Sequence, residues 1–281
     1  PWVPELASKG ALIPLDNYCK ESMISKDLFF PAFWEMLNLY GHTWALPTTP
    51  TATALYWNKG LFKEAGLDPE KPPKTLDELK EYSDKITRFE NGKIKRIGFL
   101  PSWPLWTCGV YGVIFGGSWG TVNEKDTLIT ANNPKNIEAW KWTQGFVEKL
   151  GGENVQSFQE EFGNFQGPNN PFYTEMIAIE INGTWEGNFI SKFAPKISWG
   201  AAPIPTKDGT YATTVNCDCI VIPKGSKHPK EAFEFISWLM KPENLEELCI
   251  EQKKFSPLKI SDREDFIKNH PHPYIKVFID L

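Results

Sequence analysis

The stretch GHTWALPTTPTATALYWNKGLFKEAGLDP, residues 41–69, combines two β-rich segments with a run of small hydroxyl side chains. Residues 43–47 are mostly apolar and end in a proline, and residues 53–58 are mostly aliphatic and aromatic, so each segment is typical of a short strand. After the second segment the chain becomes polar and then amphipathic. The threonines around the junction are Thr48, Thr49, Thr51 and Thr53. We therefore expect two strands with a polar crossing between them, where the chain changes course.

The composition indicates a globular protein and argues against a nucleic-acid partner. The chain has 281 residues, of which 41% are hydrophobic and 23% are charged, enough for one large domain or two medium ones. Its net charge is -5, and its basic residues are scattered, whereas a surface that binds phosphates needs a basic patch. No run approaches the roughly 18 apolar residues of a membrane span. The chain begins abruptly at Pro1-Trp2-Val3-Pro4, so we expect a processed or trimmed protein whose signal segment is absent.

The cysteines and histidines predict neither a disulfide framework nor a metal site. The number of cysteines is odd, and none has C-x-x-C spacing. Cys217 and Cys219 would be separated by roughly 6.6 Å of strand rise, at the limit of what a disulfide tolerates. The histidines lack H-E-x-x-H spacing, and no phosphate loop or dinucleotide fingerprint is present. We expect no cofactor. We also expect all five cysteines to be structural or free thiols, at Cys19, Cys108, Cys217, Cys219 and Cys249.

Helical and strand patterns alternate along the chain, which predicts an α/β fold. A helix is expected over 75–86, where Thr75 and Glu78 have the spacing of a capping box. Further helices are expected over 134–150 and 229–240, each with proline at its start. Their predicted apolar faces are Ile137, Trp140, Val147 and Leu150 in the first, and Ala232, Phe235, Ile236 and Leu239 in the second. Besides the two opening strands, strands are expected over 96–100, 175–182, 198–205 and 218–224.

The aromatic content is high, at 14% of the residues with 12 tryptophans. Most of these rings suit a tryptophan-rich core. Several tryptophans, however, lie beside glycine, proline or asparagine, in turns where a core residue is less expected. A ligand contact and ordinary packing are both open for these residues, which are Trp2, Trp103, Trp106, Trp119 and Trp185.

Five phrases in order make the sequence resemble the extracellular solute-binding proteins of ABC importers. The longest is residues 41–86, with an aliphatic strand that ends Y-x-N-K, followed by L-F-x-x-A-G, P-P-x-T and D-E-L. The others are ELASKGALIPLDNY (5–18), EMIAIEINGTWEGNF (175–189), GAAPIP (200–205) and CIVIPKGSKHPKEAFEFISWLM (219–240). Within that family the resemblance is to the sugar-binding group that includes maltose-binding protein. It implies a two-lobed periplasmic-binding-protein-like fold with hinge strands that cross between the lobes.

The resemblance also implies domain limits. The first lobe would hold 1–52 and 214–255, and the second lobe would hold 58–210 and 256–281, with hinge crossings at 53–57 and 211–213. Family members have a strand–helix–strand unit before the first matching phrase and several helices beyond residue 281. We therefore expect a chain that lacks part of its first lobe and its C-terminal end.

The resemblance assigns candidate ligand-binding residues. Trp185 falls on the ring-stacking position after the G-x-W turn, and Trp103 matches a second stacking aromatic more loosely. Thr49 and Thr51 follow the proline where family ligand contacts lie, although threonine also simply suits a β-strand. Small hydroxyls at a cleft wall would offer donors and acceptors to a polyhydroxylated ligand. The remaining candidates are Asp218, Asn216, Trp119, Trp2 and Glu186, for which packing or an ordinary turn role is as plausible.

The predicted function is capture of a carbohydrate, an oligosaccharide, in an interlobe cleft and its delivery to the permease subunits of an ABC transporter. The protein is expected to be an extracellular or periplasmic monomer, either free or anchored as a lipoprotein. One alternative is the same fold with a non-sugar solute. The other is a carbohydrate-active hydrolase, whose acid pair would come from Glu160, Glu161, Glu175, Glu180 and Glu186.

Overall fold

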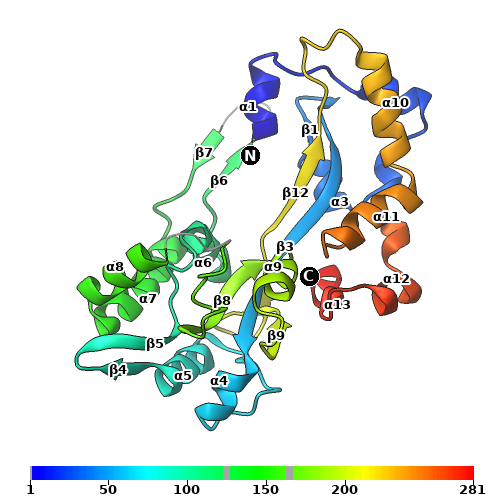
Figure 1. Cartoon of the computed structure of the whole chain (residues 1–281). Helices are drawn as coiled ribbons and strands as arrows, with labels where there is room; N and C mark the ends of the chain where they lie inside the picture. The colour runs from blue at the N-terminus through cyan, green and yellow to red at the C-terminus, as the bar shows by residue number, and fades with distance from the viewer. Residues whose placement is uncertain (1, 123–126, 163–166) are drawn as a thin grey trace. The chain divides into compact units, whose positions relative to one another are not determined.

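The computed structural model describes residues 2–122, 127–162 and 167–281, and Figure 1 shows helices and strands alternating along the chain. The predicted α/β class is confirmed. The chain divides into two compact units. Unit 1 consists of Pro1–Thr51 and Val215–Ile279, and unit 2 consists of Ala52–Thr214 and Asp280–Leu281. The following paragraphs treat each unit separately.

A single long strand, β3 (Leu46–Asn58), runs from unit 1 into unit 2, and all 13 of its residues are buried. The expectation of two strands, 43–47 and 53–58, with a crossing between them was wrong. Threonine is a good strand former, and Pro47 and Pro50 lie before the stretch in which β3 pairs with β8. The threonine run is therefore part of the strand. The chain reverses direction before β3, in a small hairpin of β1 (Asn38–Leu39) and β2 (His42–Thr43).

The sheet of unit 2 is built around β8 (Ile177–Gly183), all of whose residues are buried. On one side β8 pairs antiparallel with β3, from Thr53 opposite Gly183 to Trp57 opposite Ile179. On the other side it pairs in parallel with β5 (Lys93–Phe99), and β4 (Arg88–Glu90) follows β5. The strand β9 (Trp199–Ala202) pairs antiparallel with the end of β3. Two small pairs complete the strands of unit 2, β6 (Gly120–Val122) with β7 (Thr127–Ile129), and β10 (Ile204–Pro205) with β11 (Tyr211–Ala212).

Three helices of unit 2 begin at side-chain caps, one of which the sequence analysis predicted. Thr75 accepts a hydrogen bond from the backbone N–H of Glu78 at 3.1 Å, as the capping-box pattern predicts. Asn58 caps an earlier helix and Asn133 caps a later one in the same way. The helical segments are α4 (Lys59–Glu64), α5 (Leu76–Ile86), η2 (Leu105–Gly109), α6 (Val110–Ile114), α7 (Pro134–Leu150), α8 (Gly152–Glu161) and α9 (Glu186–Phe193).

The predicted apolar face of α7 was partly wrong. Ile137 and Trp140 are 45% and 48% exposed, whereas Ala139 and Phe146 are buried. The buried side chain of Asn136 explains the orientation, because its amide donates to the carbonyl oxygens of three residues in the preceding loop. A buried polar group with several partners is costly to expose, so it fixes the face of the helix that turns inward.

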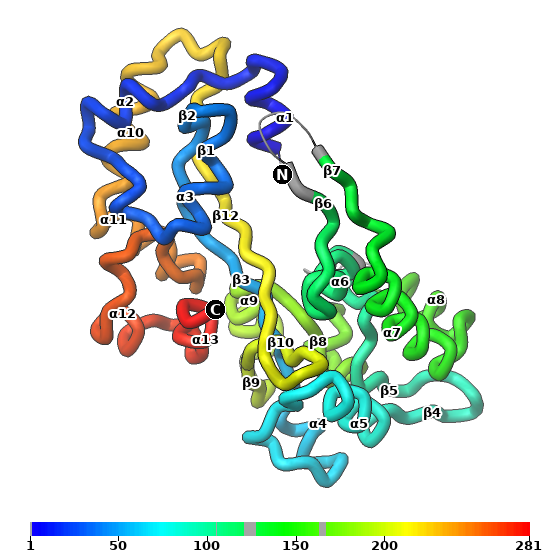
Figure 2. Tube along the Cα trace, turned by 180° about the vertical axis from the view of Figure 1, so that it is seen from behind, coloured from blue at the N-terminus to red at the C-terminus, as the bar shows by residue number. Residues whose placement is uncertain are grey.

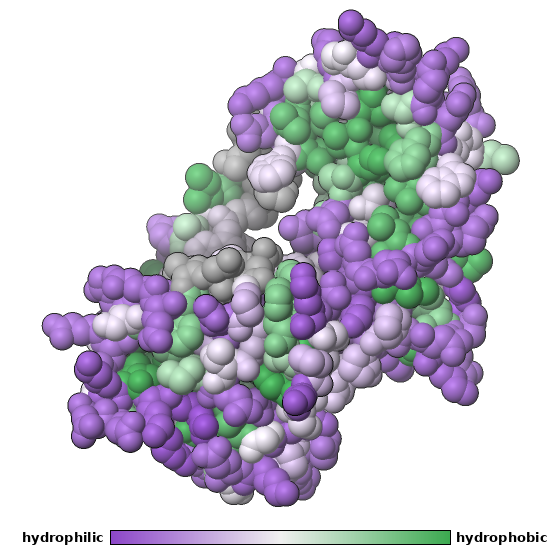
Figure 3. All heavy atoms as spheres, viewed as in Figure 1, coloured by the Kyte–Doolittle hydropathy of each residue, from purple (hydrophilic) through white to green (hydrophobic). Residues whose placement is uncertain are grey.

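Unit 1 contains the other helices and the strand β12 (Val215–Ile220), which pairs with β3 at the edge of the sheet. Figure 3 shows apolar side chains gathered over the part of unit 1 near β12. On α10 (Pro229–Leu239) the predicted apolar residue Phe235 is 55% exposed and stacks on Trp238, while Phe233 is buried in its place. The further helical segments are α1 (Trp2–Ser8), α2 (Asp16–Glu21), η1 (Lys26–Leu28), α3 (Pro31–Glu35), α11 (Pro242–Glu251), η3 (Lys259–Ser261), α12 (Glu264–Asn269) and α13 (Ile275–Asp280).

The segment 256–281, which was expected in the second lobe, packs almost entirely in unit 1. Figure 2 shows α12 and α13, in red, continuing from α11. Leu258 is buried in the core of unit 1 and forms a β-bridge with Phe29. Arg263 forms a bidentate pair with Glu246 of α11. Apolar burial and this ion pair hold the segment on unit 1, so the prediction was wrong.

All five cysteines are free thiols in the structure. Within the described residues, no group of three or more histidine, cysteine or acidic side chains could hold a metal ion. No helix in the described ranges combines the length and apolar character needed to cross a membrane.

The close packing of β5 on α5 gives a test of the fold of unit 2. A methyl group added at Gly98 would lie 2.2 Å from the carbonyl oxygen of Ser83. We expect Gly98→Ala to lower the free energy of unfolding by about 1–3 kcal/mol, because backbone atoms must move apart. The matched control is Gly145→Ala in α7, where nothing lies within 4 Å and a gain of about 0.5–1 kcal/mol is expected. Urea unfolding followed by circular dichroism measures both, and equal stability of the two variants would contradict this packing.

Candidate functional site

The turn between β8 and α9 positions Trp185. The strand ends at Gly183, the helix begins at Glu186, and Trp185 occupies the N-cap position between them. A methyl group added at Gly183 would lie 2.5 Å from the six-membered ring of Trp185. The indole therefore rests directly on the backbone of Gly183, and only glycine leaves room for it.

A second tryptophan, Trp106 in η2, lies beside Trp185. Their ring centroids are 5.4 Å apart with an interplanar angle of 51°. Trp106 is 38% exposed, and Trp185 is partly buried. We call these two rings the indole platform. The sequence indicated Trp106 only as one of several turn tryptophans, and the motif PSWPLW does not distinguish it from Trp103.

The other predicted tryptophans are not part of this platform. Trp103 is only 4% exposed, and its ring packs edge-on against Phe158. The indole N–H of Trp119 donates to the carbonyl oxygen of Gly109 at 2.6 Å. Trp2 lies in α1 of unit 1 and is 75% exposed.

Two buried acids, Glu180 and Glu186, lie next to the turn that carries Trp185, and neither has any exposed surface. The amide nitrogen of Asn182 donates to Oε1 of Glu180 at 3.1 Å and to Oε2 of Glu186 at 2.7 Å. The hydroxyl of Tyr173 donates to Oε1 of Glu186 at 2.5 Å. Oε2 of Glu180 and Nε1 of Trp103 are buried, and neither forms a hydrogen bond of standard geometry with a described residue. We call Glu180, Asn182, Glu186 and Tyr173 the acid network.

Burial dominates the electrostatics of this network. It raises the pKa of Glu180 to about 7, against the opposing effects of Asn182, Glu186 and Trp103. Burial, and then the charge of Glu180, raise the pKa of Glu186 well above its usual range. No ion pair to either acid is found among the residues that the structure describes. The pair of acids therefore keeps at least one proton at neutral pH, because the pKa of Glu186 lies well above its usual range. Glu186, which the sequence suggested as a ligand residue, makes its contacts within this network.

A polar cluster in unit 1 contains two of the predicted residues. The hydroxyl of Thr49 donates to Oδ2 of Asp218 at 2.7 Å, and the ammonium of Lys254 lies 2.7 Å from the same oxygen. Partial burial would raise the pKa of Asp218, but hydrogen bonds from Lys254 and Thr49 outweigh it and lower the pKa. No motif in the sequence indicates Lys254. Thr51 is buried in β3, and the side chain of Asn216 accepts a hydrogen bond from the backbone N–H of Cys217.

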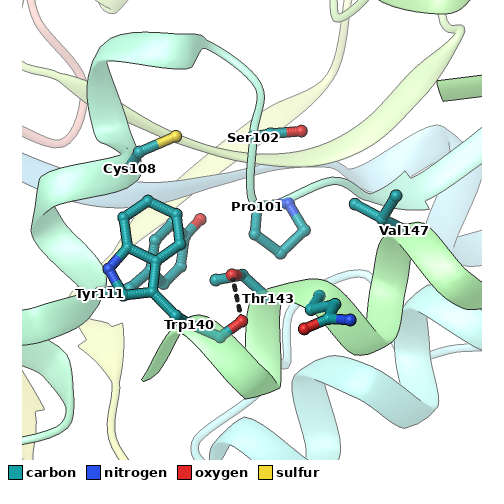
Figure 4. Close-up of a pocket in the computed structure, with 8 residues that line it drawn as sticks. Pro101, Ser102, Cys108, Tyr111, Trp140, Thr143 and Val147 are labelled. Carbon is teal, nitrogen blue, oxygen red and sulfur yellow. Dashed lines mark hydrogen bonds between the residues drawn. The ribbon is translucent and has the colours of Figure 1, made fainter. Parts of the chain in front are cut away.

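Unit 2 also has a surface pocket of about 310 Å³ between α7 and the loop after β5. Figure 4 shows Trp140, Thr143 and Val147 of α7 facing Pro101, Ser102 and Cys108. Tyr111 and Gln144 complete the lining, so the pocket contains none of the predicted ligand-binding residues.

The raised pKa values give a prediction for stability. An acid whose pKa is raised on folding keeps its full contribution below its unfolded pKa and loses stability as pH rises through its folded pKa. We expect the free energy of unfolding to fall by about 3 kcal/mol or less between about pH 4.5 and about pH 7. Glu180→Gln removes the titrating group and should flatten this slope. Urea unfolding at several pH values measures the pH dependence of the free energy of unfolding. The control is Glu161→Gln, which changes an exposed glutamate. An unchanged slope in Glu180→Gln would contradict the assignment.

The chain is similar to sugar-binding proteins in both sequence and structure. It is 26% identical to the maltotriose-binding protein of Pyrococcus abyssi over 97% of this chain and 56% of that protein. It is also 26% identical to the sn-glycerol-3-phosphate-binding periplasmic protein UgpB of Shigella flexneri, over 74% of this chain and 47% of that protein. The chain thus spans about half the length of these curated relatives. The solved structure of CpMnBP1 with mannobiose bound matches with a TM-score of 0.86 and 32% identity, over 98% of this chain and 69% of that one.

The family model described as bacterial extracellular solute-binding protein matches residues 1–246. That match covers most of the chain and both of its compact units. The resemblance stated from the sequence is confirmed, and so is the predicted type of fold. The chain belongs to the family of bacterial extracellular solute-binding proteins.

Proposed function

We propose that this chain captures a carbohydrate, and specifically an oligosaccharide, for an ABC importer. The observation that carries the proposal is the indole platform of Trp185 and Trp106. A sugar ring has an apolar C–H face, and a flat aromatic ring covers that face well. The similar proteins named for maltotriose and mannobiose support an oligosaccharide as the ligand class.

Sugar hydroxyls also need polar partners. In unit 1, Thr49, Asp218 and Lys254 offer a hydroxyl, a carboxylate and an ammonium within one cluster. Such a set can both accept and donate hydrogen bonds, which suits a polyhydroxylated ligand. We propose that this cluster can contribute polar contacts to a sugar.

We infer that the protein binds its ligand without catalysis. Among the glutamates considered for a hydrolase, Glu180 and Glu186 do lie together, but both are completely buried and are engaged by Asn182. A glycosidase acid must reach the glycosidic oxygen. Incubation with labelled mannotriose and maltotriose should therefore yield no cleavage products by chromatography. Cleavage that depends on either acid would overturn this inference.

The partners of the whole protein are part of the same proposal. Family membership supports delivery to the permease subunits of an ABC transporter and an extracellular or periplasmic location. We propose a monomer, either free or anchored as a lipoprotein.

A phosphorylated solute is the alternative that the UgpB relative raises. A phosphate ligand usually requires arginine or lysine at the site. The arginines of this chain are engaged elsewhere, since Arg96 and Arg263 form ion pairs and Arg88 donates to two backbone carbonyls. The ammonium of Lys254 is already paired with Asp218. A neutral sugar fits the platform better.

The platform predicts which substitutions weaken binding. A thermal-shift screen of mannobiose, mannotriose, maltotriose and sn-glycerol-3-phosphate on the full-length protein would first identify a ligand. We expect Trp185→Ala and Trp106→Ala each to lower the affinity for that ligand by at least about tenfold in calorimetry, because each removes a stacking face. Trp238→Ala, which changes an exposed tryptophan of unit 1, is the matched control and should bind normally. Unchanged affinity in Trp185→Ala would remove that residue from the site.

A further inference from the structure

We propose that the acid network is a positioning device for Trp185, and that its hydrogen bonds to Asn182 set the affinity of the indole platform. The inference rests on the proposed function, because it concerns the same platform. It concerns residues that position a binding group and do not themselves contact the ligand.

The network holds the backbone on which the indole rests. The side-chain oxygen of Asn182 accepts a hydrogen bond from the N–H of Gly183 at 2.9 Å. The hydroxyl of Tyr56 donates to the carbonyl oxygen of Gly183, also at 2.9 Å. Both polar groups of Gly183 are thus fixed by side chains, and the ring of Trp185 lies directly on this residue. A shift of Gly183 would therefore move the indole.

The orientation of Asn182 depends in turn on the two acids. Its amide has two hydrogens, and it donates one bond to Glu180 and one to Glu186. Glu186 is also the first residue of α9, directly after Trp185. Asn182 is therefore bonded to one acid in the strand before the turn and to one acid in the helix after it.

The charge state of the acids decides whether this arrangement is stable. The titratable groups that face them are Tyr56 of β3 and Tyr173, which lies before β8. Burial and the nearby acids raise the pKa of both tyrosines, so neither supplies a charge near neutral pH. No lysine, arginine or histidine of the described chain forms an ion pair with either acid. Protonation thus keeps Glu180 uncharged below neutral pH, and Glu186 stays protonated when Glu180 ionises, because its pKa is raised further above the usual range.

Loss of that proton should disturb the turn. Burial raises the pKa of Glu180 to about 7, so Glu180 keeps its proton below that pH and ionises as pH rises through it. The side chains of Asn182 and Trp103 favour the charged form of Glu180, but burial outweighs them, so its charge is poorly compensated. A single buried carboxylate without a cation would then draw the amide of Asn182 toward Glu180, and Asn182 would move Gly183 and the indole that rests on it. The platform should therefore bind less tightly at alkaline pH.

The test uses the full-length protein labelled with 5-fluorotryptophan. Fluorine NMR without ligand follows Trp185, assigned with Trp185→Phe, and the exposed Trp238, assigned with Trp238→Phe. We expect the Trp185 resonance to titrate between about pH 5.5 and about pH 8.5, and the Trp238 resonance to stay constant. Calorimetry with mannotriose over the same range should show affinity falling by at least about threefold. Glu180→Gln should abolish both pH dependences, while Glu161→Gln should keep them.

The outcomes separate the two proposals. If mannotriose and the other sugars of the screen do not bind at any pH, the proposed function fails, and the ligand-free titration alone decides the positioning role. A Trp185 resonance that is constant with pH, or a Glu180→Gln variant that titrates like the wild type, would overturn the positioning role even if sugar binds. If the network were merely structural, Glu180→Gln would be less stable, but the Trp185 resonance would depend on pH in the same way as in the wild type.

Discussion

The antiparallel ladder between β3 and β8 is the constraint on which the rest of unit 2 depends. It begins with Thr53 opposite Gly183, so the end of the ladder coincides with the residue that supports Trp185. A shift of one residue would turn every side chain of β8 to the other face of the sheet. Glu180 and Asn182 alternate with Ile179 and Ile181 along this strand, so the register places the polar residues on one face and the isoleucines on the other.

The polar face of β8 is unusual because it is buried. Two carboxyl groups without a cation are costly in a protein interior. Hydrogen bonds from Asn182 and Tyr173 offset that cost, and the raised pKa values favour the protonated acids. An apolar pair would pack there at lower cost. The polar pair instead fixes the orientation of one amide, and that amide fixes one glycine. A continuous series of contacts thus connects the two acids, through Asn182 and Gly183, to the indole of Trp185.

The sequence predicted features that depend on local chemistry. The cap at Thr75, the helix that ends before Gly151 and the turn at Trp185 all follow from neighbouring residues. It failed where distant residues decide the outcome. The inward face of α7 depends on a buried asparagine, and the place of the C-terminal segment depends on Leu258 and on the ion pair of Arg263 with α11. For the same reason the sequence did not distinguish Trp106 from the other turn tryptophans and did not indicate Lys254, since each acquires its role from a partner far away in the chain.

The edge strand β12 has a consequence for handling the protein. It pairs with β3 on one side, and its first residue, Val215, is exposed, while Cys217 and Cys219 are partly buried. Open strand edges with apolar side chains template intermolecular pairing. Burial raises the pKa of Cys217 to about 12, so its reactive thiolate is scarce at neutral pH and oxidation is slow. Aggregates of this chain should therefore be noncovalent, and they should dissolve in mild denaturant rather than in reducing agents.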